Sequence, residues 1–243
     1  TRSGQWAGWR PDLLLGRNVS GATLGLAGFG RIARATAQRA AAFGMEVIFC
    51  SHPPSGRPVD DDEIAALSFP ARQVGWEEVV ATSDYLSVHV PLAPDTRHLV
   101  DATILAAMKP TATLINTARG PVVDEAALVR ALRDGQLAAA GLDVYENEPN
   151  LVDGLAELPN VLLLPHLGSA TVEVRDRMAE LCAANAVAIG QRRMPPHCVN
   201  PEAWILRGVD SRFAKADEHS SGPWACSTAW AMRSGSGSAC RIP

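Results

Sequence analysis

A short apolar run at residues 24–27 leads into three small residues, Gly28, Gly30 and Ala33, spaced as Gly-x-Gly-x-x-Ala. The first glycine permits a tight turn, the second lets a pyrophosphate group approach the backbone, and the small third residue lets a helix pack closely on a strand. The N-terminus of the alanine-rich segment that follows offers unpaired N–H groups and a partial positive charge to phosphate oxygens. The spacing therefore favours a dinucleotide-binding turn over the alternative, a tight packing turn without a ligand.

Other side chains that can do chemistry follow later apolar runs, each at the point where the run ends. Hydroxyl, imidazole, guanidinium and carboxyl groups are all present, which suits the binding of a charged ligand and the transfer of a proton. They are Ser51 and His52, His89, the segment 116–119 with Arg119, Asp143 and His166. If the runs are parallel strands of one sheet, these groups converge on one edge of it.

The elements that must position these groups are apolar runs alternating with helical patterns, as in a parallel sheet covered by helices on both faces. Right-handed crossovers then give a doubly wound α/β fold of the Rossmann type, which binds ligands at the carboxyl ends of its strands. The predicted strands are residues 23–27, 45–50, 84–90, 112–116, 137–144 and 160–164. The predicted helices are residues 32–43, 61–67, 76–81 and 101–108, one that Asp124 N-caps and Gly135 ends, and a long amphipathic one at 171–190.

The composition favours a small-molecule ligand over a large charged partner. The chain has 243 residues, of which 47% are hydrophobic and 20% charged, enough for one α/β domain plus additional segments. A net charge of -4 gives no electrostatic reason to bind nucleic acid or an anionic membrane. No apolar run reaches the roughly 18–20 residues that cross a bilayer.

The cysteines and histidines lack the spacing of a metal site. The five cysteines are odd in number and scattered, which favours free thiols in a reducing compartment and hence the cytoplasm. The histidines form neither an HxxxH nor an HExxH pattern, and no GxSxG motif is present. We therefore expect neither a metal centre nor a serine hydrolase.

Five motifs follow one another in the order found in a known family. They are the turn at 28–33, His89-Val90-Pro91-Leu92 with Thr96, Ile115-Asn116-Thr117-Ala118-Arg119-Gly120, Gly141-Leu142-Asp143-Val144-Tyr145-Glu146-Asn147-Glu148-Pro149, and Pro165-His166-Leu167-Gly168-Ser169. Over residues 1–200 the chain resembles the cofactor-binding domain of the D-isomer-specific 2-hydroxyacid dehydrogenases. Within that family it is most similar to the glyoxylate and hydroxypyruvate reductases.

This resemblance implies three catalytic residues. Arg119 corresponds to the residue that grips the 2-oxo acid, a task that suits a bidentate guanidinium. His166 corresponds to the acid that protonates the alkoxide as the hydride arrives, and imidazole exchanges its proton near neutral pH. Glu148 corresponds to the carboxylate that orients His166, although Glu146, two residues earlier, is an alternative. The resemblance leaves open which 2-oxo acid is the substrate.

The resemblance also implies a nicotinamide dinucleotide cofactor. An acidic residue usually binds the ribose of NAD about 20 residues beyond the glycine turn, but here the second strand ends in Cys50-Ser51-His52 and the first acid is Asp60. We therefore favour NADP, with NAD as the alternative. Arg31 is either a pyrophosphate contact or a solvated side chain, and Asp143 either meets the nicotinamide carboxamide or caps its loop. The cofactor-binding residues predicted are Gly28, Gly30, Arg31, Ile32, Ser51, His52, Pro91, Thr96, Thr117, Ala118, Asp143 and Gly168.

The domain organisation predicted from the resemblance has four parts. Residues 1–17 form a connector whose Trp6 and Trp9 lie either at a homodimer contact or in an interdomain packing helix, and residues 18–170 form the dinucleotide-binding domain. Residues 171–200 contain the long helix that packs on a substrate domain, which is largely missing. Residues 201–243 form an atypical, disordered or foreign tail, rich in Ser, Gly, Arg and Trp. The alternative to a reductase is a dinucleotide-sensing interaction module like the family's corepressor relative, working by binding partners without turnover.

Overall fold

The computed structural model describes residues 1–205. The chain divides into two compact units, Thr1–Gly168 and a second that begins at Ser169. Among the described residues, no helix is long and apolar enough to cross a membrane. The cysteines in this part of the chain, Cys50, Cys182 and Cys198, are free thiols.

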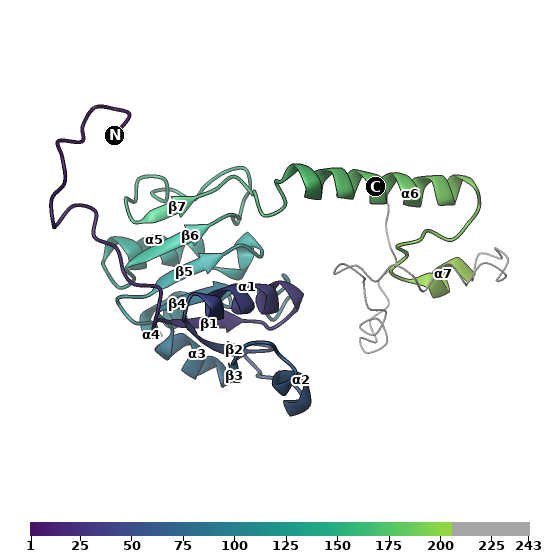
Figure 1. Cartoon of the computed structure of the whole chain (residues 1–243), viewed down its shortest axis with the longest axis horizontal. Helices are drawn as coiled ribbons and strands as arrows, with labels where there is room; N and C mark the ends of the chain where they lie inside the picture. Colours follow the sequence, from purple (N-terminus) through teal and green to yellow (C-terminus); the bar gives the residue numbers. More distant parts are fainter. Residues whose placement is uncertain (206–243) are drawn as a thin grey trace. The chain divides into compact units, whose positions relative to one another are not determined.

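The first unit is built on a seven-stranded sheet in the order β3-β2-β1-β4-β5-β6-β7, and every neighbouring pair of strands is parallel. Figure 1 shows the strands side by side in this order, with β3 at the bottom and β7 at the top. The direction of winding reverses between β1 and β4, which is the switch point at which doubly wound folds bind ligands. The predicted Rossmann-type fold is therefore confirmed. The strands are β1 (Thr23–Ala27), β2 (Glu46–Cys50), β3 (Arg72–Gln73), β4 (Tyr85–Val88), β5 (Thr113–Asn116), β6 (Ala139–Leu142) and β7 (Val161–Leu163).

Several helices of this unit begin after a capping aspartate or are followed by a glycine with positive φ. Asp124 accepts a hydrogen bond from the N–H of Ala127 and so N-caps α5, while Gly44 and Gly135, both with positive φ, follow the ends of α1 and α5. The helices are α1 (Arg31–Ala42), α2 (Asp61–Ala65), α3 (Trp76–Thr82), α4 (Ala102–Ala107) and α5 (Glu125–Arg133), with a 3-10 turn at Gly120–Val122.

Two apolar clusters flank the sheet, and the smaller one joins β1 and β2 to α1. Side chains alternate along β1, so that Leu24 and Leu26 pack against α1 whereas Gly25 faces α3. A Cβ at Gly25 would overlap the Ser83 hydroxyl, so a glycine is needed where α3 approaches the strand. The larger cluster, on the second face, includes residues of α3, α4 and α5. β1, β2 and β4 are apolar because both of their faces are covered, whereas β5, β6 and β7 keep partly exposed side chains.

The structure differs from the sequence-based expectation at the shortest elements. The edge strand β3 was not predicted, because its two residues, Arg72 and Gln73, are polar and partly exposed and carry no apolar pattern. The predicted strands at 84–90 and 137–144 are shorter at both ends in the structure. The prediction also placed the start of the tail at 201, but Pro201–Ile205 forms a short helix, α7, whose first residue is a proline as helix starts often have. The rest of the predicted tail, 206–243, lies outside the described residues.

The second unit contains the long helix expected at 171–190. It is α6 (Val172–Gly190), and the hydroxyl of Thr171 N-caps it by accepting a hydrogen bond from the N–H of Val174. Ala188 is the only residue of α6 that is buried. Several apolar side chains of α6, among them Val172, Met178 and Val187, are at least half exposed.

Candidate active site

The glycine turn joins β1 to α1 at the switch point of the sheet. Gly28 has a φ of +98°, and a Cβ there would lie 3.1 Å from the backbone carbonyl of His89, so this position favours glycine. A Cβ at Gly30 would meet nothing within 4 Å, so the space in front of that residue is open. The N-terminus of α1 has no side-chain cap and no acid in its first turn, and Arg31 and Ile32 are exposed there. These features fit the pyrophosphate of a dinucleotide, since the free N–H groups of the helix can donate to it.

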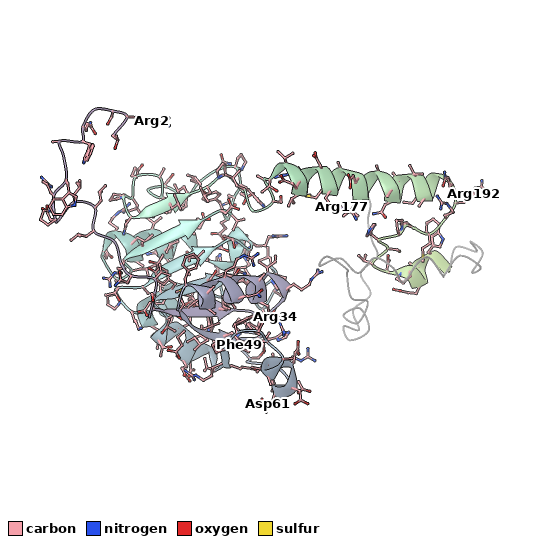
Figure 2. All side chains as sticks on the ribbon, viewed as in Figure 1. Arg2, Arg34, Phe49, Asp61, Arg177 and Arg192 are labelled. Carbon is pink, nitrogen blue, oxygen red and sulfur yellow. The ribbon has the colours of Figure 1, made fainter. Side chains whose placement is uncertain are left out.

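An aromatic stack fixes the turn to the second strand. The ring of Phe29, between the two glycines, stacks on that of Phe49 in β2 with 3.6 Å between centroids. The Arg34 guanidinium lies over Phe29, 4.7 Å from its centroid, and pairs with Glu63 at 2.6 Å. Figure 2 labels Arg34 and Phe49 at this end of the sheet. The stack leaves the backbone of the glycine turn little freedom to move.

Arg119 follows β5 and is presented by a turn that Asn116 holds. The buried Asn116 side chain donates to the Arg119 carbonyl at 3.0 Å and accepts from the Ala118 N–H at 3.1 Å. This amide bridge closes the turn and places the guanidinium, which is exposed, beyond the end of the strand. Thr117 is exposed as well, and Ala118 is partly buried. The turn is therefore rigid at its base and open at its tip.

Glu148 and His166 contact each other, although they are 18 residues apart. The His166 Nδ1 lies 3.0 Å from Glu148 Oε2, while Glu148 Oε1 accepts a hydrogen bond from the Tyr145 N–H at 2.9 Å. Glu146, the alternative partner for the histidine, instead faces His98, with 2.6 Å between Oε1 and Nε2. Of the two glutamates, Glu148 is thus the one that can orient His166.

The electrostatics of this pair indicate which of the two side chains carries the proton between them. The hydrogen bond from His166, followed by that from the Tyr145 N–H, lowers the pKa of Glu148, and the Arg119 charge lowers it further. Glu148 is therefore a carboxylate at neutral pH and only accepts hydrogen bonds, so Nδ1 of His166 is the nitrogen that donates to it. Nε2 is left to exchange a proton with another molecule. Arg119, Glu148 and His166 share one electrostatic environment at the carboxyl edge of the sheet.

Asp143 holds the loop that carries His166. One of its carboxylate oxygens accepts from the Leu167 N–H at 2.6 Å and the other from the Gly168 N–H at 2.8 Å. His166 itself has a φ of +56°, a conformation that costs a non-glycine residue energy and that surrounding contacts must impose. Asp143 is buried at the end of β6 and supplies those contacts. Asp143 thus caps this loop, and its contact with the nicotinamide carboxamide stays a prediction.

The loop after β2 contains the predicted Ser51 and His52. The buried Ser51 hydroxyl donates to the carbonyl of Arg57, and the His52 ring lies exposed beside it, with Nδ1 3.3 Å from the hydroxyl oxygen. Gln73 of β3 also donates to the Arg57 carbonyl, at 2.8 Å. The first acid after the strand, Asp60, caps α2. Residues 51–59 therefore present no carboxylate.

Pro91 and Thr96 lie in the loop after β4 and differ in exposure. Pro91 is exposed, whereas Thr96 is buried and its hydroxyl accepts from the Ala93 N–H at 2.8 Å and donates to the Pro91 carbonyl at 2.7 Å. The threonine thus shapes this loop from inside. Leu92 and Leu167 are partly exposed apolar side chains that flank the predicted site and were not predicted as members of it.

Sequence reasoning also missed Glu125 and Gly120. Glu125 is buried on α5 and accepts a hydrogen bond from the N–H of Glu146 at 2.6 Å. A sequence signal for it existed, because Glu125 shares the apolar face of the helix with Leu128, three residues on, and with Val129. A Cβ at Gly120 would overlap the Tyr145 carbonyl, a long-range contact for which the sequence has no signal.

Comparison with known proteins places this site in a family. Residues 1–168 match the family model described as D-isomer specific 2-hydroxyacid dehydrogenase, NAD binding domain. Over 205 residues the chain is 46% identical to the glyoxylate reductase of Thermococcus litoralis, a match that covers 83% of this chain and 60% of that protein. The chain thus spans about three fifths of the length of the curated relatives it matches.

Solved structures agree with the family match. A protein from Thermus thermophilus superposes with a TM-score of 0.71 at 44% identity, covering 80% of this chain and 59% of that one. An NADPH-dependent glyoxylate/hydroxypyruvate reductase from Sinorhizobium meliloti, in complex with NADP and malonate, superposes with a TM-score of 0.61 at 42% identity, covering 69% of this chain and 50% of that one. The chain therefore belongs to the D-isomer specific 2-hydroxyacid dehydrogenase family, whose NAD-binding domain it contains.

Proposed function

We propose that this chain supplies the cofactor site and the catalytic groups of a reductase that converts a small 2-oxo acid, of the glyoxylate or hydroxypyruvate type, into the 2-hydroxy acid. The observation that carries the proposal is the 3.0 Å contact between His166 and Glu148, on the sheet edge that also bears the glycine turn. The names of the relatives described above support an enzyme and give no support to an interaction module without turnover.

Each of the three side chains has a distinct task in this proposal. The Arg119 guanidinium binds the carboxylate and the 2-oxo group, which keeps the substrate carbonyl in a fixed orientation. The nicotinamide dinucleotide supplies the hydride when it is bound. His166 donates the Nε2 proton to the oxygen that becomes the hydroxyl, and Glu148 stabilises the positively charged imidazole before that transfer. In the reverse direction His166 accepts the proton.

NADP is the cofactor that the loop after β2 supports best. No carboxylate of residues 51–59 is present to repel a 2′-phosphate, and His52 and Arg57 are exposed there. Because the Ser51 hydroxyl donates to the Arg57 carbonyl, His52 and Arg57 are better phosphate donors than Ser51. The relative from Sinorhizobium meliloti is described as NADPH-dependent.

Other expectations stay predictions. These are the division into four segments, a homodimer formed through the exposed Trp6 and Trp9, a substrate domain that closes the site, and a cytoplasmic location.

Replacement of Arg119 tests the proposed catalytic site. Turnover is measured in a hybrid in which this chain replaces the matching part of the Thermococcus litoralis enzyme, because the chain spans about three fifths of that protein. Arg119→Ala should reduce turnover of glyoxylate at least about a hundredfold and leave NADPH affinity within about twofold, since a charge-assisted bidentate contact is lost from the substrate alone. Arg119→Lys keeps the positive charge but loses the bidentate geometry, so its turnover should lie between that of the wild type and that of Arg119→Ala. An equal loss of turnover and of NADPH affinity contradicts the assignment.

A charge reversal at His52 tests the cofactor preference. In the chain itself, His52→Asp should weaken NADPH binding at least about tenfold and leave NADH binding equal or tighter, because a carboxylate repels the 2′-phosphate and accepts from a ribose hydroxyl. Titration calorimetry with each dinucleotide measures both effects. The charge-matched control is Gln136→Glu, an exposed site after α5. Equal weakening for both dinucleotides contradicts the assignment to NADP.

A further inference from the structure

Glu125 is a buried carboxyl group for which the proposed chemistry has no task. It is the first residue of α5 and only 2% exposed, on the helix face that also carries the buried Leu128 and Val129. A carboxyl group in such a place costs stability unless it is hydrogen-bonded, and an apolar residue would pack there at lower cost. A buried carboxyl group at this position therefore needs compensating contacts in the structure around it.

The partner of Glu125 is the loop that carries Glu148. Glu125 Oε1 accepts a hydrogen bond of 2.6 Å from the Glu146 N–H. The adjacent Tyr145 N–H donates to Glu148 Oε1 at 2.9 Å, and Glu148 Oε2 contacts His166. One backbone segment of four residues thus joins the buried carboxyl group to the pair at the surface.

The segment that contains Tyr145 and Glu146 is held at two further points. These contacts restrict the movement of Glu146. Gly120 lets the 3-10 turn after Arg119 pack directly on the backbone of Tyr145. On the outer side the Glu146 carboxylate pairs with His98 at 2.6 Å and with Arg97 at 3.2 Å. Glu125 supplies the third contact, from inside the core.

The surroundings of Glu125 impose an electrostatic cost. Burial, followed by the nearby carboxylates of Glu146 and Glu148, raises the pKa of Glu125, and only the Glu146 N–H opposes that rise. Glu125 is held at this cost by one hydrogen bond. The position that this bond gives to the Glu146 N–H explains the buried carboxyl group better than a contribution to stability does.

We propose that Glu125 is a positioning residue that sets the contact between Glu148 and His166 by holding the backbone N–H of Glu146. The role is mechanical: an acceptor oxygen at the right depth is required, and a negative charge is not. The catalytic importance of this role rests on the proposed function, but the contact itself can be tested without measuring turnover.

The test is the titration of the Glu148 carboxyl carbon by NMR in this chain, with the signal assigned by its loss in Glu148→Gln. Glu125→Asp keeps the charge but is one methylene too short to reach Glu146, so the pKa of Glu148 should rise by at least about 0.5 toward that of a free glutamate. Glu125→Gln keeps the acceptor and loses the charge, so the pKa of Glu148 should stay where it is or fall. Glu77→Asp, an exposed acid in the first turn of α3, is the matched control and should change nothing.

Three results overturn the proposal. The first is a Glu148 titration in folded Glu125→Asp that equals that of the wild type. The second is a rise in Glu125→Gln as large as in Glu125→Asp, because loss of a negative charge cannot raise the pKa of Glu148, so an acceptor oxygen at residue 125 would then not be what holds the contact. The third needs no variant: the Glu146 amide proton should exchange slowly in the wild type, and exchange at the rate of an exposed amide contradicts the bond. An inactive hybrid with the expected titrations would refute the proposed reductase and leave the positioning role intact.

Discussion

His89 stays uncharged next to the glycine turn that we propose as the phosphate site. Its Nε2 lies 3.0 Å from the Ser87 hydroxyl, its backbone N–H donates to the Ala27 carbonyl, and the Gly28 backbone packs against its carbonyl group. Burial lowers the pKa of His89 to about 4. The positive potential available to a pyrophosphate at the proposed site would therefore come from the backbone of α1 and not from this imidazole.

Acid should therefore destabilise the protein through His89. Between pH 6.5 and about 4 the unfolded chain binds a proton at this residue that the folded chain does not, so stability is full above pH 6.5 and falls as pH drops. The loss should reach about 3 kcal/mol by pH 4. Denaturant titrations at several pH values measure it, with His89→Gln as the reference that lacks the imidazole. Parallel curves for the two proteins would refute this reading.

At the scale of elements, two loops bring Glu148 and His166 together. Asp143, at the end of β6, binds two N–H groups of the loop that carries His166. Glu125, at the start of α5, binds the loop that carries Glu148. Each loop is thus fixed to a buried carboxyl group on a regular element, which gives two exposed side chains a defined separation.

At Gly120 the turn after Arg119 contacts the loop that carries Glu148, with no side chain between them. Gly120→Ala should destabilise the protein by more than about 2 kcal/mol, because its Cβ overlaps the Tyr145 carbonyl and the backbone has to shift. Gly141→Ala in β6 is the matched control: its Cβ meets nothing within 4 Å, so its effect should stay within about 0.5 kcal/mol. Chemical denaturation compares the two. A Gly120→Ala protein as stable as Gly141→Ala would mean that the loop is not held at this point.

The sequence predicted elements with strong periodic patterns and missed contacts between distant residues. The apolar run at 23–27 and the capping pair around α5 predicted those elements directly. The two polar residues of β3 have no such signal, since their pairing with β2 depends on the finished sheet. The bonds of Asp143 and Glu125 join residues more than 20 positions apart, so only the folded chain reveals them.

At the scale of the whole molecule, the sheet gathers the predicted site on one edge. Parallel strands end at the same side, so the glycine turn after β1, Arg119 after β5 and His166 after β7 reach one rim from distant parts of the sequence. The chain contains the cofactor-binding domain of its family and spans about three fifths of its curated relatives. The complete reductase cycle is therefore tested in the hybrid, whereas dinucleotide binding is tested in the chain itself.

Transfer of deuterium from the cofactor to the substrate tests the proposed reductase chemistry. The hybrid is given glyoxylate and NADPH deuterated at the transferable position of the nicotinamide ring, and the glycolate formed is analysed by mass spectrometry. One deuterium should appear on the carbon that bears the new hydroxyl, and Arg119→Ala should form this product at least about a hundredfold more slowly. Glycolate without deuterium, or no glycolate from a hybrid that binds NADPH, would contradict the proposed chemistry.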